Sequence, residues 1–164
     1  MKIWNIVKIT CGLIVTAFVV ACGDSTTYYQ IENRKSGHYL ASDGSTGLKQ
    51  KSEPGDSGLW ELIESEDGFY QILNKESQLY VSTMGSQIKE PMQQTDAPGD
   101  DALWEKVSEG FDEGYIGFRN KDSDRYLNTG GATDDNTDIL QTENTATQDS
   151  VPGTGAQWIL IEQE

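Results

Sequence analysis

The chain has 164 residues, of which 27 are acidic and 12 are basic, so its formal net charge is −15. Nucleic-acid-binding domains usually need a basic face that neutralises phosphates, so this balance argues against a nucleic-acid partner. A single histidine and two cysteines exclude a Cys/His zinc site and a disulfide-stapled scaffold, and we expect neither a metal nor a cofactor. The length fits one domain, and the hydrophobic content of 35% is enough to build a core.

The N-terminus is built like a secretory signal. Lys2 and Lys8 are followed by an apolar run over residues 9–21, which is shorter than the roughly 20 residues that cross a bilayer as a helix. The run ends in Val-Val-Ala-Cys, and this ending resembles the lipobox of bacterial lipoproteins. The resemblance implies that residues 1–21 are a cleaved signal peptide. It also implies that Cys22 is the lipid attachment residue, carrying acyl chains such as palmitate that anchor the protein in a membrane. The alternative is an ordinary signal peptide.

Residues 22–27 then form a lipidated N-terminus and a short polar tether, which holds the domain close to the membrane. Cleavage removes Lys2 and Lys8, so the formal charge of the mature chain changes from −15 to −17, and the protein is strongly acidic. Gly23, rather than an aspartate, follows the cysteine. By resemblance to enterobacterial sorting rules, this favours the outer membrane, with the domain on the periplasmic or cell-surface face.

Residues 28–164 contain three repeats. In each repeat an asparagine, a basic residue, a serine and a tyrosine recur at the same offsets, and the tyrosine always follows the asparagine by 6 residues. Each unit closes with Pro-Gly and a tryptophan, which follows the proline by 6 residues. The recurring residues are asparagines 33, 74 and 120, tyrosines Tyr39, Tyr80 and Tyr126, and tryptophans Trp60, Trp104 and Trp158.

The local pattern in every unit is β. Apolar residues alternate with polar ones in the opening segments, which predicts strands that bury one face. Asparagine followed by polar residues predicts a tight turn, and Pro-Gly predicts another. Because one such unit cannot bury its own apolar face, three should pack together. We therefore predict an all-β fold, a β-trefoil of three repeats with four short strands each. The recurring tryptophans and tyrosines should be structural core residues of a monomeric domain.

Residues 33–40, Asn-Arg-Lys-Ser-Gly-His-Tyr-Leu, resemble the repeat of the ricin-type β-trefoil family, whose units often close with Gln-x-Trp. The resemblance covers roughly residues 28–163 and implies a carbohydrate-binding module. Sites of this family use an aspartate after the start of the second strand, an aromatic residue from the next hairpin, and amides near the closing tryptophan. Here the aspartate position holds Ala41, Ser82 and Asn128, and the glutamine position holds Gly58, Ala102 and Ala156. No aromatic residue follows the third strand in any unit.

Unit three differs from the others in the length of its loop. The spacing from the tyrosine to the closing proline is 15, 18 and 26 residues in units one to three, and the extra residues in unit three are mostly polar. Long loops on a rigid scaffold often carry function. The candidate carbohydrate-binding residues are Asn128, Asp134, Asn136, Asp138 and Asn144. The alternative is a solvated surface loop. The spacing of Asp134, Asn136 and Asp138 also resembles the start of an EF-hand calcium loop, but the glycine and the distal glutamate of that loop are missing.

The sequence does not predict an enzyme. His38 stands where the other units have Leu79 and Arg125, and no thiol nucleophile remains after processing. Two functions therefore stay open. The first is a lipid-anchored, lectin-like module of the cell envelope that binds a glycan or polysaccharide. The second is an envelope protein-interaction or structural lipoprotein whose trefoil has lost sugar binding. The lost aspartate and glutamine positions favour the second function, whereas the usual role of the family and the polar loop favour the first, which we take as the prediction with the second as its alternative.

Overall fold

The computed structural model describes residues 26–85, 91–142 and 153–164. The predicted signal peptide and Cys22 lie outside these ranges, and no helix within them has the length and apolar character that a bilayer crossing requires. The strands of the described ranges are β1 (Tyr28–Asn33), β2 (Tyr39–Ser42), β3 (Leu48–Lys51), β4 (Trp60–Glu64), β5 (Phe69–Asn74), β6 (Tyr80–Ser82), β7 (Gln93–Thr95), β8 (Trp104–Val107), β9 (Gly117–Asn120), β10 (Tyr126–Asn128), β11 (Leu140–Thr142) and β12 (Trp158–Gln163). Short 3-10 turns are η1 (Gly55–Gly58), η2 (Glu66–Gly68), η3 (Asp100–Ala102) and η4 (Thr154–Ala156).

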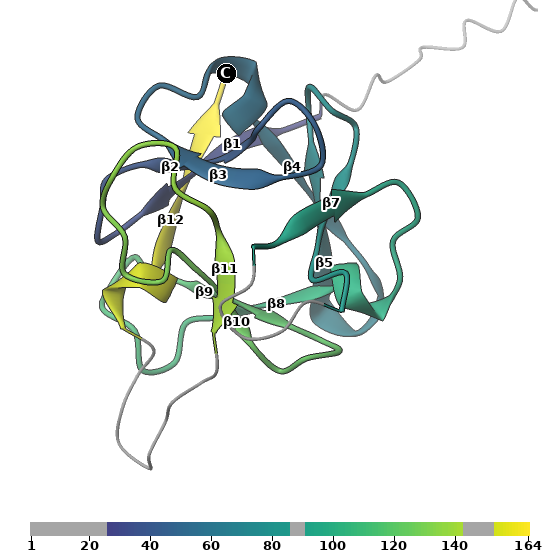
Figure 1. Ribbon diagram of the computed structural model, residues 1–164. Coiled ribbons are helices and arrows are strands. Elements are labelled where there is room, and N and C mark those ends of the chain that lie inside the picture. Colours follow the sequence, from purple (N-terminus) through teal and green to yellow (C-terminus); the bar gives the residue numbers. More distant parts are fainter. Residues whose placement is uncertain (1–25, 86–90, 143–152) are drawn as a thin grey trace, which may run out of the picture.

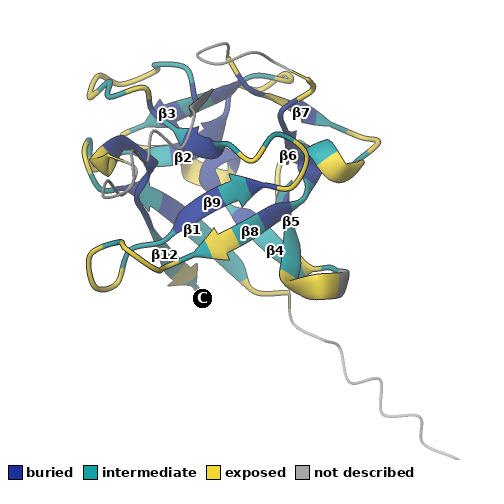
Figure 2. Cartoon of the chain, turned by 90° about the horizontal axis from the view of Figure 1, so that it is seen from below, coloured by how far each residue is buried: buried dark blue, intermediate teal, exposed yellow. Residues whose placement is uncertain are grey.

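The first and last strands of each unit form a closed antiparallel barrel. β1 pairs with β12 and β4, β5 pairs with β4 and β8, and β9 pairs with β8. A bridge between Ile116 and Trp158 joins β9 to β12 and closes the ring. The hairpins β2–β3, β6–β7 and β10–β11 cover one end of this barrel, and the C-terminus lies at the other end (Figure 1, Figure 2). This arrangement confirms the predicted all-β trefoil with four strands in each unit.

The core consists of four residues from each unit, at equivalent positions. All of them are at most 1% exposed. The core residues are, by equivalent position, Ile31, Ile72 and Phe118; Leu40, Val81 and Leu127; Leu48, Met92 and Ile139; and Trp60, Trp104 and Trp158. The fixed spacing of the repeats therefore places the equivalent side chains of the three units in one shared core.

Each core tryptophan also makes the same polar contact. The indole nitrogen Nε1 donates to the carbonyl of the residue that follows the recurring tyrosine, at 2.9 Å for Trp60, 3.0 Å for Trp104 and 3.1 Å for Trp158. A buried indole N–H needs an acceptor, because an unpaired one costs free energy. The bond ties the closing strand of each unit to its own second strand.

The recurring tyrosines are not equivalent, although the sequence predicts all three in the core. Tyr126 is 3% exposed, whereas Tyr39 and Tyr80 are only half-buried. Tyr126 packs against Phe111, with ring centres 6.1 Å apart. It also lies over Gly117, where a Cβ would come within 2.9 Å of its ring. A small residue and an extra aromatic ring, both specific to unit three, bury this tyrosine.

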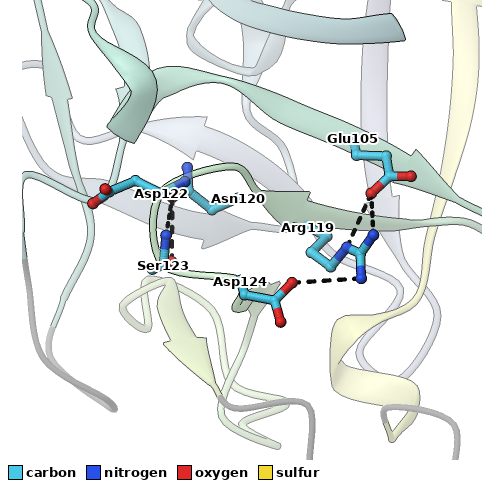
Figure 3. A network of polar contacts seen from close by, with 6 residues as sticks. All are labelled: Glu105, Arg119, Asn120, Asp122, Ser123 and Asp124. Atoms are coloured by element: carbon cyan, nitrogen blue, oxygen red, sulfur yellow. Dashed lines mark hydrogen bonds and ion pairs between the residues drawn. The ribbon is translucent and has the colours of Figure 1, made fainter. Parts of the chain in front are cut away.

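The recurring asparagines organise the turn after each opening strand. In unit three, Oδ1 of Asn120 accepts hydrogen bonds from the backbone N–H groups of Asp122 and Ser123, as Figure 3 shows. Its Nδ2 donates to the carbonyls of Asp101 and Leu103, which belong to the closing segment of unit two. Asn33 and Asn74 make the same two kinds of bond. Each asparagine thus shapes its own turn and joins its unit to the preceding one.

Candidate functional site

The three units differ most where the second strand ends beside the 3-10 turn that precedes the tryptophan. The residue three positions before the tryptophan is Ser57, Asp101 or Gly155 in units one to three. In unit one, the ammonium group of Lys51 occupies the space between the end of β2 and Ser57. It donates to the carbonyl of Ser42 at 2.7 Å and to Oγ of Ser57 at 3.3 Å. Together with Ala41, which offers no polar side-chain atom, this leaves unit one without a free polar group there.

In unit two, a carboxylate of the closing turn occupies the corresponding position. Oγ of Ser82 donates to Oδ2 of Asp101 at 2.5 Å, and the N–H of Met84 donates to the same Oγ at 2.9 Å. The backbone N–H of Thr83 donates to the carbonyl of Asp101 at 3.0 Å. Ser82 stands at the family's aspartate position, so the structure brings a carboxylate there from a different part of the chain.

In unit three, no side chain of the closing turn occupies this position, because Gly155 stands there. A Cβ on Gly155 would lie 2.8 Å from Oδ1 of Asn128, 3.0 Å from Oγ1 of Thr129 and 3.3 Å from the backbone N of Gly131. These three polar atoms therefore converge on a buried glycine. Asn128 is half-buried, and its Oδ1 accepts a hydrogen bond from the N–H of Gly130 at 2.8 Å.

Some polar groups of this region are unsatisfied. Thr129 is 1% exposed, and its Oγ1 has no hydrogen-bond partner among the described residues. Thr83, its equivalent in unit two, is in the same state. Buried hydroxyls normally find a partner, so an orphan marks a place where a further polar group is expected. In unit three the unpartnered hydroxyl lies beside Gly155, 3.0 Å from the point where a Cβ would be.

The predicted loop residues lie elsewhere. Asp138 pairs with the ammonium group of Lys49, and Nδ2 of Asn136 donates to Oδ2 of Asp135 at 3.1 Å. The carbonyl of Asp134 accepts a hydrogen bond from Nε2 of Gln50 at 3.0 Å. The loop thus pairs with β3 of unit one, and Figure 1 shows it beside that strand. The predicted residues Asp138 and Asn136 make these contacts through their side chains and Asp134 through its carbonyl, and none of these contacts is with Asn128.

One predicted residue cannot be placed, and one residue that was not predicted has a shifted pKa. Asn144 lies outside the described residues. Asp135, which the sequence did not single out, has its pKa lowered, mainly because its carboxylate accepts a hydrogen bond from the backbone N–H of Ser52. Within the described ranges no three His, Cys, Asp or Glu side chains are grouped so that they could hold a metal ion.

Sequence reasoning missed Thr129 and Gly155 in unit three, and Asp101 in unit two. A signal existed for the two closing-turn residues: aligning the three Pro-Gly-to-tryptophan segments sets Ser57, Asp101 and Gly155 at one position. The alignment alone does not show that this position faces the end of the second strand.

The chain was compared with known proteins. A family model described as "Ricin-type beta-trefoil lectin domain-like" matches residues 16–94 and 56–142. None of the curated proteins matches the sequence.

Several solved structures share the fold. A designed threefold-symmetric protein, ThreeFoil, is 24% identical with a TM-score of 0.70, covering 83% of this chain and 99% of that one. The ricin B-like lectin of Macrolepiota procera, solved with lactose, is 15% identical with a TM-score of 0.69, covering 83% and 95%. An exo-β-1,3-galactanase from Clostridium thermocellum is 20% identical with a TM-score of 0.72, but the 84% of this chain that matches corresponds to only 30% of the galactanase chain. The first two matches span nearly the whole of their proteins, whereas the third is to one part of an enzyme.

Proposed function

This chain belongs to the ricin-type β-trefoil lectin-like family, and from this premise we propose that it is a non-catalytic carbohydrate-binding module held at the cell envelope by a lipid on Cys22. Sugar binding is placed in unit three, at Asn128, Thr129 and Gly131. The lectin from Macrolepiota procera, which has the same fold, was solved with lactose, and this supports a glycan as the class of ligand.

One observation carries the choice of unit three: at Gly155 the closing turn of this unit carries no side chain against Asn128, Thr129 and Gly131. Asn128 is half-buried and carries a side-chain amide, and the backbone N–H of Gly131 makes no hydrogen bond with another described residue. The hydroxyl of Thr129 is buried behind them and has no partner among the described residues. Donors and acceptors at this spacing suit the vicinal hydroxyls of a sugar. In units one and two the same position is filled by Lys51 or by Asp101.

The placement of the chain ends fits an anchored module. Tyr28, the first residue of β1, pairs with Gln163, and the C-terminus lies at the barrel end opposite the hairpins (Figure 2). Residues 22–27 reach at most about 20 Å when extended, so a lipid on Cys22 would hold that barrel end near the membrane. The hairpins, and with them the end of β10, would then face away from the bilayer.

Titration of residues 24–164 with mono- and oligosaccharides, followed by amide NMR shifts, tests the proposal. We expect shifts around Asn128 and Gly131, with a Kd of about 0.1–1 mM, because a few hydrogen bonds in competition with water leave little net free energy. Asn128→Ala should abolish the shifts.

Gly155→Ser provides a sharper variant. Its Cβ would lie 2.8 Å from Oδ1 of Asn128, so it should displace that side chain, abolish binding and lower the free energy of unfolding, which denaturant unfolding measures alongside the titration. Ser57→Gly is the matched control, and it should leave the sugar-induced shifts in place. Shifts centred on Ala41 or Ser82 would refute the site, and no shifts with any sugar would refute the function.

The second candidate is a protein-interaction or structural lipoprotein. The contacts of Asp138 with Lys49, and of Asp134 with Gln50, favour it, because the loop that distinguishes unit three is used to join units one and three. A loop with this role needs no ligand. Sugar titrations without any response, together with a partner captured by crosslinking in the envelope, would support this candidate.

A further inference from the structure

The site in unit three differs from its two equivalents in charge. The closing turns of units one and two carry carboxylates, with Asp56 in the first and Asp100 and Asp101 in the second. The corresponding residues of unit three are Thr154 and Gly155, so η4 has no acidic residue. In a chain with a formal net charge of −15, this is a local exception.

A lysine from unit one lies beside this uncharged turn. Nζ of Lys35 is 3.2 Å from the point where a Cβ on Gly131 would lie. Lys35 is exposed, and no carboxylate of a described residue pairs with it. By contrast, other basic side chains have acidic partners; these are Arg34, Lys49, Lys75, Arg119 and Lys121. An unpaired ammonium group therefore stands next to the polar atoms around Gly155.

The other two units place the opposite charge at the position of Lys35. Counting two residues from Asn33, Asn74 and Asn120 gives Lys35, Glu76 and Asp122. Each of these turns contacts the closing segment of the preceding unit, so Lys35 is the only one of the three that brings a cation, and it brings it to unit three. The three turns have the same backbone arrangement, so they can be compared directly, and they differ in the sign of the charge at this position.

We propose that unit three binds a glycan that carries an anionic group, such as the carboxylate of a uronic acid, and that Lys35 contacts this group. The backbone N–H of Gly131 and the hydroxyl of Thr129 are the neighbouring donors for the anion or an adjacent ring hydroxyl. This inference rests on the proposed function. It adds a class of ligand that the acidic surface as a whole would repel, so a preference for anions has to come from local contacts.

Calorimetric titration of the full-length protein in detergent micelles tests this, with D-galacturonic acid and D-galactose as a charged and an uncharged probe of the same ring. At low salt we expect the acid to bind about tenfold more tightly, as one hydrogen bond between charged groups allows. Lys35→Gln should remove this preference, and Lys35→Arg should retain it. The part of the preference contributed by Lys35, measured as the difference between the parent and Lys35→Gln, should fall as the salt concentration rises, because the contact is exposed.

Lys106→Gln is the matched control. It removes the same charge from β8, where Nζ of Lys106 lies 3.8 Å from the ring centre of Tyr70, away from the site. This variant should keep the preference. Equal affinity for both sugars, or an equal loss in the Lys35 and Lys106 variants, would overturn the inference and leave the proposed function intact. If neither probe nor any other sugar binds, the proposed function fails, and the inference fails with it.

Discussion

Nζ of Lys75 lies 5.2 Å from the ring centre of Tyr28, so a cation of unit two stands over an aromatic ring of unit one. The same ammonium group is 3.6 Å from a carboxylate oxygen of Asp56, which is also in unit one. Lys121 repeats the arrangement one unit further along, over Phe69 at 5.4 Å and 3.1 Å from Asp100. An aromatic ring and a carboxylate of one unit thus hold a cation of the next.

The third copy of this contact uses different residues to the same effect. Arg34 of unit one lies 5.0 Å from the ring centre of Tyr115 in unit three. Thr154 replaces the aspartate of the other closing turns, and Arg34 pairs instead with Asp112 and donates to Oε1 of Gln157 at 2.7 Å. The contact between the first and last units is therefore retained although the chain is not continuous there.

The first prediction concerns the contact of Lys75 with Tyr28 and Asp56. Lys75→Met should lower the free energy of unfolding by about 0.5–1 kcal/mol, as an exposed cation–π contact does. Because Lys75 and Asp56 are both substantially exposed, their ion pair should add little. A double-mutant cycle with Tyr28→Leu, measured by urea unfolding, should show coupling between the two residues. A coupling energy of zero would mean that the ring and the cation are merely neighbours.

The second prediction concerns the tryptophans. Each of Trp60, Trp104 and Trp158 is fully buried, so replacement by alanine should cost about 3–5 kcal/mol of unfolding free energy at each position. Trp104→Phe should remain destabilising, because it leaves the carbonyl of Val81 without its indole donor. Denaturant unfolding of the variants measures both effects. Variants that unfold like the parent would contradict the core assignment.

The sequence predicts the repeated features of the fold well, because they recur at fixed spacing. The positions of Trp60 and Asn33 each follow from a local pattern that is present three times. The features that differ between units depend on contacts far apart in the sequence. Asp138 pairs with a lysine 89 residues away, and Asp101 reaches Ser82 across 19 residues. No local pattern specifies such a partner, so the sequence does not predict that Asp138 lies beside Lys49 or that Asp101 lies beside Ser82.

The burial of Tyr126 shows the same limit and leads to a third prediction. Burial raises the pKa of its phenol, so the folded state favours the neutral form. The ordinary pKa of tyrosine is about 10. The stability that this group contributes is therefore fully present below about pH 10, and it is lost as the pH rises through the higher pKa of the folded state.

Tyr126→Phe checks this directly. The pKa of Tyr39 is also raised, mainly by burial, so ultraviolet difference spectra of tyrosinate should show that the variant has one fewer phenol titrating above the ordinary range than the parent. The variant should also lose less stability than the parent between neutral and strongly alkaline pH. Gly117→Ala is a useful companion, because its Cβ would lie 2.7 Å from the ring of Phe111 and disturb the cover over Tyr126. If all phenols titrate together in the parent, burial does not protect Tyr126.

The fourth prediction concerns the anchor and depends on the Val19-Val20-Ala21-Cys22 ending of the apolar run. In the bacterial lipoproteins that this ending resembles, the cysteine thiol accepts the diacylglyceryl group, so Cys22→Ser should abolish incorporation of labelled palmitate and release the domain from membranes. Two or more acyl chains give stable attachment, since each buried methylene contributes about 0.8 kcal/mol. The formal net charge of −15 is repelled by anionic headgroups, so we expect the lipid to supply the attachment.

Cys11→Ser is the matched control for this experiment. It removes the other cysteine of the chain, which lies within the apolar run, and it should leave both palmitate labelling and membrane fractionation unchanged. Cell fractionation with the two variants side by side separates loss of a specific acceptor from a general disturbance of the signal. If the Cys22→Ser protein is labelled and membrane-bound like the parent, the lipoprotein assignment is wrong. The attachment would then have to come from a part of the chain other than Cys22, and the orientation of the hairpins away from the bilayer would lose its basis.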